Sequence, residues 1–248
     1  MNTQQNTILI TGGSAGIGMA IAKLFSENGN QVIITGRNEE RLQKAAAQLK
    51  NVTAIQADVT KEEDMDKLVA RVQRDFPALN ILINNAGNAY VYKLGQGANA
   101  AAKASEEMLT NYLAPISLTE KLLPLLEKQP EAAVVNVSSI VAFAPGQRLP
   151  TYAASKAALH SYTLSLRLAL EPTSVKVFEL MPPLVDTEFS TEIGGANGIA
   201  PSVVAEDLFT AFENNTYQIH VGRTADLYQL SLASPAEALL AMNPKQPA

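Results

Sequence analysis

The chain has 248 residues, of which 47% are hydrophobic, so one large domain with a sizeable buried core is expected. Its net charge of −5 comes from 24 acidic and 19 basic side chains without a basic block, which argues against nucleic acid as a partner. Because no apolar run is long enough to span a membrane and cysteine is absent, we expect a cytoplasmic protein without disulfides, membrane partners or cysteine-ligated metal.

Short β-branched runs alternate along the chain with stretches whose apolar residues recur at helical spacing. Strands are predicted over residues 7–11, 31–35, 52–56, 79–83, 133–137, 175–180 and 217–221. Helices are predicted over residues 17–28, 39–49, 62–76, 102–126, 152–171 and 203–212, and Pro115 is expected to bend the longest. The alternation predicts one α/β domain over residues 1–248, with a doubly wound parallel sheet and helices on both faces.

A glycine-rich turn, Thr11-Gly12-Gly13-Ser14-Ala15-Gly16-Ile17-Gly18, joins the first predicted strand to the first predicted helix. Backbone N–H groups and the positive end of a helix converge at such a turn, which suits a pyrophosphate. Glycine is needed wherever a Cβ would block the turn or the approach of the phosphate. The turn therefore predicts a dinucleotide site, although glycines at this position can also serve the tight turn alone.

The end of the second predicted strand, Thr35-Gly36-Arg37-Asn38, indicates which dinucleotide is bound. Enzymes that prefer NAD usually place a carboxylate here to hold the ribose hydroxyls. This chain has Arg37 instead, whose guanidinium could hold a 2′-phosphate through two hydrogen bonds. The alternative is a solvated arginine at the start of a helix. We expect NADP(H) to be favoured, with NAD(H) as the other possibility.

Tyr152 and Lys156 are four residues apart at the start of a predicted helix, so they share one helix face. A phenol titrates near pH 10, and a fixed cation lowers that pKa toward neutrality. Ser138 and Ser139 close the strand over 133–137, where a hydroxyl could hydrogen-bond a substrate oxygen. The segment 84–87, Asn-Asn-Ala-Gly, closes the fourth strand at the edge where ligands bind in such sheets. Each pattern alone also fits an ordinary helix, strand end or turn.

Together, Thr11 to Gly18, Asn84 to Gly87, Ser139 and Tyr152 to Lys156 have the order and spacing of the short-chain dehydrogenase/reductase superfamily, which the chain resembles over essentially its whole length. The resemblance implies a Rossmann-type, seven-stranded and mostly parallel sheet, no metal ion, and catalysis by a Ser–Tyr–Lys set with an assisting Asn. Tyr152 would be the general acid in reduction and the base in oxidation. Lys156 would lower the pKa of Tyr152 and bind the nicotinamide ribose. Ser139 would polarise the substrate, and Asn111 would hold a water against the lysine.

The same resemblance implies the contacts to the cofactor. The expected cofactor-binding residues are Gly12, Ser14, Gly16, Ile17, Gly18, Arg37, Asp58, Val59, Asn85, Ala86, Gly87, Tyr152, Lys156, Pro182, Val185 and Thr187. Pro182-Pro183 replaces the usual Pro-Gly after the sixth strand. This form, and the residues around 234–235 and 242–243, resemble a bacterial subgroup often labelled DltE-like, a label that assigns no substrate here.

Residues 184–215 are expected to form a substrate-loop region within the domain. The expected substrate-pocket residues are Ala89, Tyr90, Val141, Phe143, Gln147, Leu184 and Phe189. Since most of them are apolar, we expect an NAD(P)H-dependent carbonyl reductase or alcohol dehydrogenase acting on a neutral, hydrophobic small molecule. One alternative is a 3-oxoacyl carrier-protein reductase, for which Lys93, Lys103 and Arg148 are thin support. Another is a non-catalytic, dinucleotide-sensing protein.

Two further features of the sequence concern metal binding and assembly. His160 and His220, without cysteine, are a poor basis for a metal site. Glu106 and Glu107 are expected on a solvated helix face. The helices that contain Asn111 and Tyr152 have more apolar residues than one sheet face needs, and in the family that the chain resembles these helices pack against another subunit. A homo-oligomer, either a dimer or a tetramer, is therefore expected.

Overall fold

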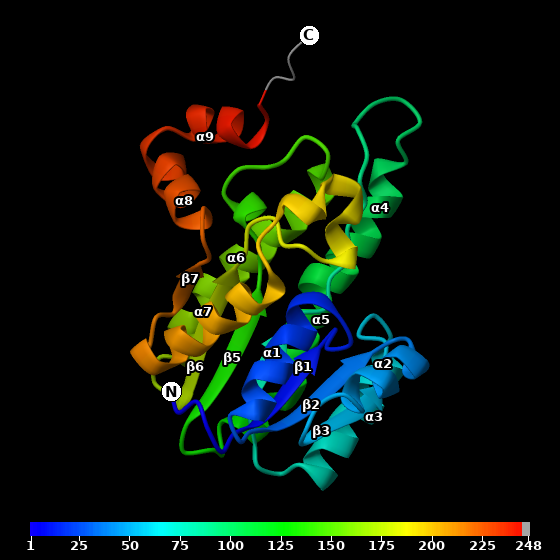
Figure 1. Ribbon diagram of the computed structural model, residues 1–248, viewed down its shortest axis with the longest axis vertical. Coiled ribbons are helices and arrows are strands. Elements are labelled where there is room, and N and C mark those ends of the chain that lie inside the picture. The colour runs from blue at the N-terminus through cyan, green and yellow to red at the C-terminus, as the bar shows by residue number, and fades with distance from the viewer. Residues whose placement is uncertain (245–248) are drawn as a thin grey trace.

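Seven parallel strands form one sheet in the order β3-β2-β1-β4-β5-β6-β7 (Figure 1). The computed structural model describes residues 1–244, so the last four residues of the expected domain lie outside the described part. The strands are β1 (Thr7–Thr11), β2 (Gln31–Gly36), β3 (Val52–Gln56), β4 (Leu79–Asn84), β5 (Ala132–Val137), β6 (Val175–Met181) and β7 (Gln218–His220). The predicted doubly wound, seven-stranded fold is confirmed.

Helices cover both faces of the sheet, and alternating side chains of each strand contact the two layers. One layer contains α1 (Gly16–Glu27), α2 (Glu39–Ala46) and α7 (Pro201–Asn214), and the other contains α3 (Glu62–Asp75), α5 (Ala114–Leu126) and α6 (Pro150–Leu170). In β1, Ile8 and Ile10 pack in the first layer and Leu9 in the second. Successive side chains of a strand point to opposite faces of the sheet. Because helices bury both faces, consecutive residues can all be apolar, which explains the continuous apolar runs.

The order of the strands reverses between β1 and β4, because β2 lies on one side of β1 and β4 lies on the other. In open α/β sheets, ligands bind beyond the carboxyl ends of the strands at this point of reversal. The glycine-rich turn follows β1, and the Asn-Asn-Ala-Gly segment follows β4. The fold therefore places both motifs at one edge of the sheet.

The helix predicted over residues 102–126 is divided into three parts by Pro115. It consists of α4 (Ala100–Met108), a π-helical turn η1 (Leu109–Leu113) and α5. Pro115 has no N–H to donate to the carbonyl of Asn111, four residues earlier, as an α-helix requires. The N–H of Ala114 instead donates to the carbonyl of Leu109, five residues earlier. Such π turns are frequent at functional sites, and this one contains Asn111.

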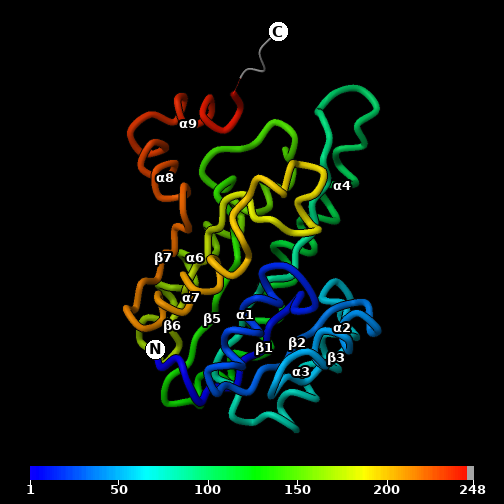
Figure 2. The backbone as a smooth tube through the Cα atoms, in the orientation of Figure 1, coloured from blue at the N-terminus to red at the C-terminus, as the bar shows by residue number. Residues whose placement is uncertain are grey.

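The end of the chain contains two helices that the sequence pattern did not reveal, since the prediction placed the last regular element at residues 217–221. These helices are α8 (Thr224–Ala233) and α9 (Pro235–Met242), and they lie with α4 at the end of the molecule away from the N-terminus (Figures 1 and 2). Leu232, Leu239 and Leu240 are exposed on these helices. Apolar residues are therefore not confined to one helix face, as they are in an ordinary amphipathic surface helix. Three short 3-10 helices also form, η2 (Ile140–Ala142), η3 (Glu188–Ile193) and η4 (Gly195–Asn197).

Across residues 1–244, none of the helices has the length and apolar character needed to cross a membrane.

Candidate active site

The glycine-rich turn is packed so tightly that side chains would not fit at several of its positions. Gly12 and Gly16 have φ angles of +67° and +53°, in the left-handed region. A Cβ on Gly18 would lie 2.4 Å from the carbonyl oxygen of Gly12. In the described part of the chain, no side chain caps the first turn of α1, which leaves its N–H groups for another acceptor. The turn therefore fits a pyrophosphate.

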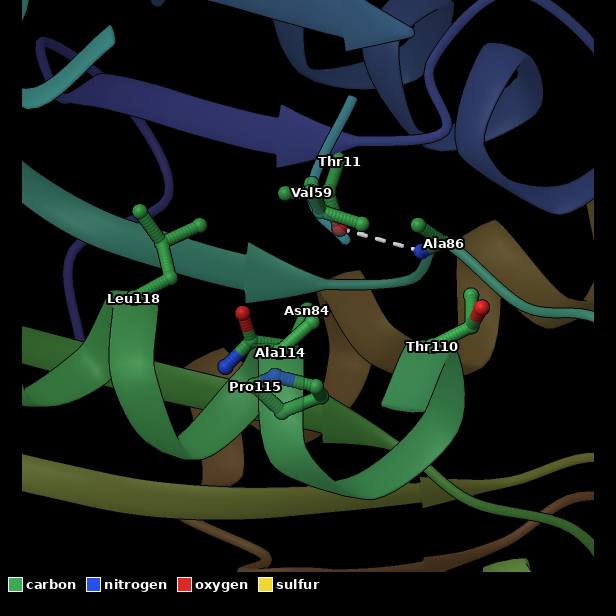
Figure 3. Close-up of a pocket in the computed structure, with 8 residues that line it drawn as sticks. All are labelled: Thr11, Val59, Asn84, Ala86, Thr110, Ala114, Pro115 and Leu118. Atoms are coloured by element: carbon green, nitrogen blue, oxygen red, sulfur yellow. Dashed lines mark hydrogen bonds between the residues drawn. The ribbon is translucent and has the colours of Figure 1, made fainter. Parts of the chain in front are cut away.

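The segment after β4 is tied to this turn by a set of hydrogen bonds. The hydroxyl of Thr11 accepts from the N–H groups of Asn85 and Ala86, both at 3.0 Å. The Asn85 side chain in turn donates to the carbonyl oxygen of Thr11, at 2.9 Å. Figure 3 shows the bond from Ala86 to Thr11 above a small pocket that Val59 also lines. These bonds hold the two expected cofactor-binding motifs in one fixed arrangement.

Arg37 and Asp58 lie near each other, where β2 and β3 end. Asp58 accepts hydrogen bonds from the N–H and the hydroxyl of Thr60, at 3.0 and 2.7 Å. Burial raises the pKa of the Asp58 carboxyl, but the bonds from Thr60 and the charges of Arg37 and Lys61 outweigh it and hold that pKa below its ordinary value. Arg37 itself is exposed, so its guanidinium is open to an anionic ligand.

Tyr152, Lys156 and Ser139 come together at the carboxyl end of β5. The Lys156 ammonium is 3% exposed, donates to the carbonyl oxygen of Val137 at 2.8 Å, and lies 5.6 Å from the centre of the Tyr152 ring. Burial raises the pKa of Tyr152, the nearby Ser139 hydroxyl lowers it, and the charge of Glu107 raises it. Burial also lowers the pKa of Lys156 to about 8, against the opposing charge of Glu179.

Asn111 is fully buried and connects the π turn to the rest of this site. Its side-chain oxygen accepts from the N–H of Asn88, and its amide donates to the carbonyl oxygen of the same residue, both at 2.8 Å. The amide also donates to the Ser155 hydroxyl at 2.9 Å, and that hydroxyl donates to the carbonyl oxygen of Tyr152 at 2.7 Å. Asn111 therefore lies one side chain away from the tyrosine, and it is not on a solvated face.

The remaining expected residues divide between the site and its surroundings. The ring of Phe189 lies 6.0 Å from that of Tyr152, and a Cβ on Gly16 would lie 3.1 Å from the Thr187 side chain. Phe143 lies instead in an aromatic cluster with His160, His220 and Tyr228. The other expected residues line the loops at this edge, where Val141, Pro182 and Val185 are buried, Ser14, Ile17, Ala89, Tyr90 and Leu184 are half-buried, and Gly87 and Gln147 are exposed.

Glu107 was expected on a solvated face together with Glu106, and this was wrong, because Glu107 is fully buried. One of its carboxylate oxygens accepts from the N–H of Tyr90 at 2.7 Å. The other is buried and has no hydrogen-bond partner within residues 1–244. The spacing of four residues between Glu107 and Asn111 could have indicated that both side chains lie on the inner helix face.

Two other contacts at this edge were not foreseen. Arg41 on α2 forms an ion pair with Glu188 at the start of η3. Leu227 of α8 and Ala238 of α9 pack in one cluster with Ile140 and Val141, against which Tyr152 also packs. Among the described residues, the structure brings together no group of three or more His, Cys, Asp or Glu side chains that could hold a metal ion.

Comparison with known proteins identifies the family and agrees with the fold. Residues 6–198 match the family model described as short chain dehydrogenase. The chain is 41% identical to the uncharacterized oxidoreductase DltE of Bacillus subtilis strain 168 over 212 residues, which cover 86% of this chain and 84% of that protein. A short chain dehydrogenase from Burkholderia cenocepacia J2315 in complex with NADP superposes with a TM-score of 0.86 at 25% identity, covering 99% of this chain and 100% of that one. The 3-ketoacyl-(acyl-carrier-protein) reductase of Brucella melitensis, complexed with NADH, superposes with a TM-score of 0.77 at 26% identity, covering 85% and 91%.

Proposed function

This chain belongs to the short-chain dehydrogenase family of NAD(P)-dependent oxidoreductases, and we propose that it reduces neutral, hydrophobic ketones and oxidises the corresponding secondary alcohols. The observation that supports this reaction is the convergence of the Tyr152 phenol, the Ser139 hydroxyl and the Lys156 ammonium at the carboxyl edge of the sheet, the edge at which the glycine turn also lies. These are the groups needed to exchange a proton with a carbonyl oxygen and to stabilise the charge that develops on it.

The cofactor, when bound, supplies or accepts the hydride, and the side chains of the chain manage the proton. In reduction, Tyr152 donates its phenolic proton to the carbonyl oxygen of the substrate. Ser139 holds that oxygen through its hydroxyl, and the Lys156 ammonium favours the phenolate that remains on Tyr152. In oxidation the phenolate takes the proton back. Asn111 connects the π turn to α6 through its bond to Ser155, and its expected role is to hold a water against the lysine.

We further propose that NADPH is preferred over NADH. Arg37 is exposed at the end of β2, where its guanidinium can pair with a 2′-phosphate. No carboxylate ends this strand, and Glu39 and Glu40 come too late to replace the one usual in NAD enzymes. The related structures contain both kinds of cofactor, so the preference depends on this chain's own residues. Replacing Arg37 with Ala is expected to weaken the binding of NADPH about tenfold and to leave the binding of NADH unchanged. The reason is that a charge-assisted hydrogen bond contributes about 1.5–3 kcal/mol.

The apolar character of the expected pocket supports a hydrophobic substrate. Phe189 is close to Tyr152, and the cluster under the tyrosine is formed by aliphatic side chains of η2, α8 and α9. We also propose a homo-oligomer, because Leu109, Leu113 and Leu168 are exposed at 40%, 49% and 75% on the helical segments that contain or follow the site residues. Covering this surface with a second copy would remove it from water.

The proposed reaction is tested by Tyr152→Phe, with turnover measured by NADPH oxidation against aryl ketones, diketones and acyl thioesters. The variant is expected to lose about 10²–10⁴-fold in kcat, since a positioned proton donor contributes this much, and to keep its affinity for NADPH. Tyr162→Phe is the matched control, because Tyr162 is on the same helix and contacts Tyr112 away from Ser139. If Tyr152→Phe kept most of its turnover, the mechanism would be wrong. A strong preference for acyl thioesters on a carrier protein would instead support a 3-oxoacyl carrier-protein reductase.

A further inference from the structure

A second buried carboxylate, Glu179, lies on the side of the sheet that α6 covers. It is in the middle of β6, where its neighbours Phe178 and Leu180 point into the opposite layer. Its side chain is 0% exposed. A carboxylate loses its hydration when it is buried, so a position of this kind is favourable only if partners satisfy its charge and its hydrogen bonds.

The partners of Glu179 come from two neighbouring elements. The Ser138 hydroxyl, at the end of β5, donates to one carboxylate oxygen at 2.5 Å. The Nδ1 atom of His160, on α6, lies 3.0 and 2.9 Å from the two oxygens. Ser138 precedes the expected catalytic Ser139, and its hydroxyl binds the Glu179 carboxylate. The carboxylate is therefore fixed in position from both sides.

Helix α6 places its basic side chains on the face toward Glu179. His160 follows Lys156 by four residues and Arg167 follows His160 by seven, so all three share this face. The charge of Glu179 opposes the effect of burial on the pKa of Lys156, of Arg167 and of His220 in β7. In the described residues, the basic groups around Glu179 are therefore His160, Lys156, Arg167 and His220. Of these, Lys156 is the one at the reaction site.

We propose that the buried charge of Glu179 stabilises the Lys156 ammonium without a direct ion pair, and that His160 and Ser138 are positioning residues that hold its carboxylate on the face of the sheet that α6 covers. The proposal rests on the function proposed above, in which the lysine must be charged to favour the phenolate of Tyr152. Lys156 itself is 3% exposed, so its ammonium has lost most of its hydration and depends on nearby protein groups for stabilisation. Glu179 acts through the lysine and touches neither substrate nor cofactor.

The experiment measures the protonation of Lys156 directly, so it remains interpretable even if no substrate is found. The ε-carbon resonance of Lys156 is assigned by its loss in Lys156→Met and titrated by NMR in the protein without cofactor. The expected midpoint of the native chain is near pH 8. In Glu179→Gln, which keeps the size of the side chain and removes its charge, the midpoint is expected to fall by about one pH unit. An unmoved midpoint would overturn the proposal.

Two further variants separate this effect from a general disturbance of the core. Glu107→Gln is the matched control, because Glu107 is equally buried and its charge acts on Tyr152, so the Lys156 midpoint is expected to stay unchanged. If it moved as far as in Glu179→Gln, the assignment to Glu179 would be wrong. His160→Ala is expected to lower the midpoint by less than Glu179→Gln, and His160→Asn, which keeps a donor near the Nδ1 position, is expected to restore it. His160 is 22% exposed in its side chain, so these variants remain informative if Glu179→Gln does not fold.

Turnover gives the second readout. In kcat measured against pH, loss of the lysine charge produces the alkaline limb, and Glu179→Gln is expected to move that limb toward lower pH by the same amount as the NMR midpoint. A variant that only loosened the fold would lower kcat at every pH and leave the limb in place, which would refute the role of Glu179. A native chain that turns over no carbonyl would refute the proposed function. The NMR comparison would still show whether the charge of Glu179 acts on Lys156.

Discussion

Gly18 offers the sharpest test of the cofactor site, because a single methyl group there would strike the backbone of the glycine turn and the Asn85 side chain of the segment after β4. A Cβ at this position would lie 2.4 Å from the carbonyl oxygen of Gly12 and 2.5 Å from the side-chain nitrogen of Asn85. These two atoms are themselves joined by a hydrogen bond of 3.2 Å. The first contact is with backbone at the turn, so Gly18→Ala must shift the start of α1 away from Gly12.

The magnitude follows from the cost of adding a methyl group to a filled space, about 1–3 kcal/mol. That cost is divided between the stability of the fold and the affinity for the cofactor, since about 1.4 kcal/mol corresponds to a tenfold change in affinity. We expect Gly18→Ala to bind NADPH about tenfold more weakly or to unfold at a lower temperature, or both.

The assay titrates the fluorescence of NADPH, which is simple to interpret because the chain has no Trp. Thermal unfolding is recorded on the same samples. Gly146→Ala is the matched control, because a Cβ there would meet no atom within 4 Å and its backbone is outside the left-handed region. Native affinity and native thermal stability in Gly18→Ala would together refute the reasoning.

Two other predictions follow from the buried charges. Glu107→Gln keeps an acceptor for the N–H of Tyr90 but removes a charge that raises the pKa of Tyr152, so the pKa seen in the pH profile of alcohol oxidation should fall; a profile identical to that of the native chain would contradict this. Burial lowers the pKa of Lys156 from 10.5 to about 8, so between these values the unfolded chain holds the proton that the folded chain has lost, and raising the pH favours folding. Urea unfolding should therefore show the native chain gaining about 1.4 kcal/mol per pH unit over Lys156→Met between pH 8 and 10, whereas a constant difference would show that burial does not shift this pKa.

Much of the fold is determined locally and could be predicted from the sequence. The alternation of apolar runs and helical spacing identified all seven strands and six stretches of helix, because burial of both sheet faces leaves a continuous apolar signal in each strand. The glycine turn and the spacing of Tyr152 and Lys156 were equally readable, since a tight turn and a shared helix face each depend on neighbours in the chain. The family and the class of reaction followed from these motifs together.

The charges around the site depended on the tertiary structure. Glu107 and Glu179 are ordinary acidic residues in the sequence, and their burial depends on which side of a helix or strand meets a distant element. The aromatic cluster that contains Phe143, and the helices α8 and α9, likewise depend on contacts between segments far apart. Sequence spacing reports which side chains share a face, whereas the charge a site needs depends on what packs against that face, and this contact forms only when the chain folds.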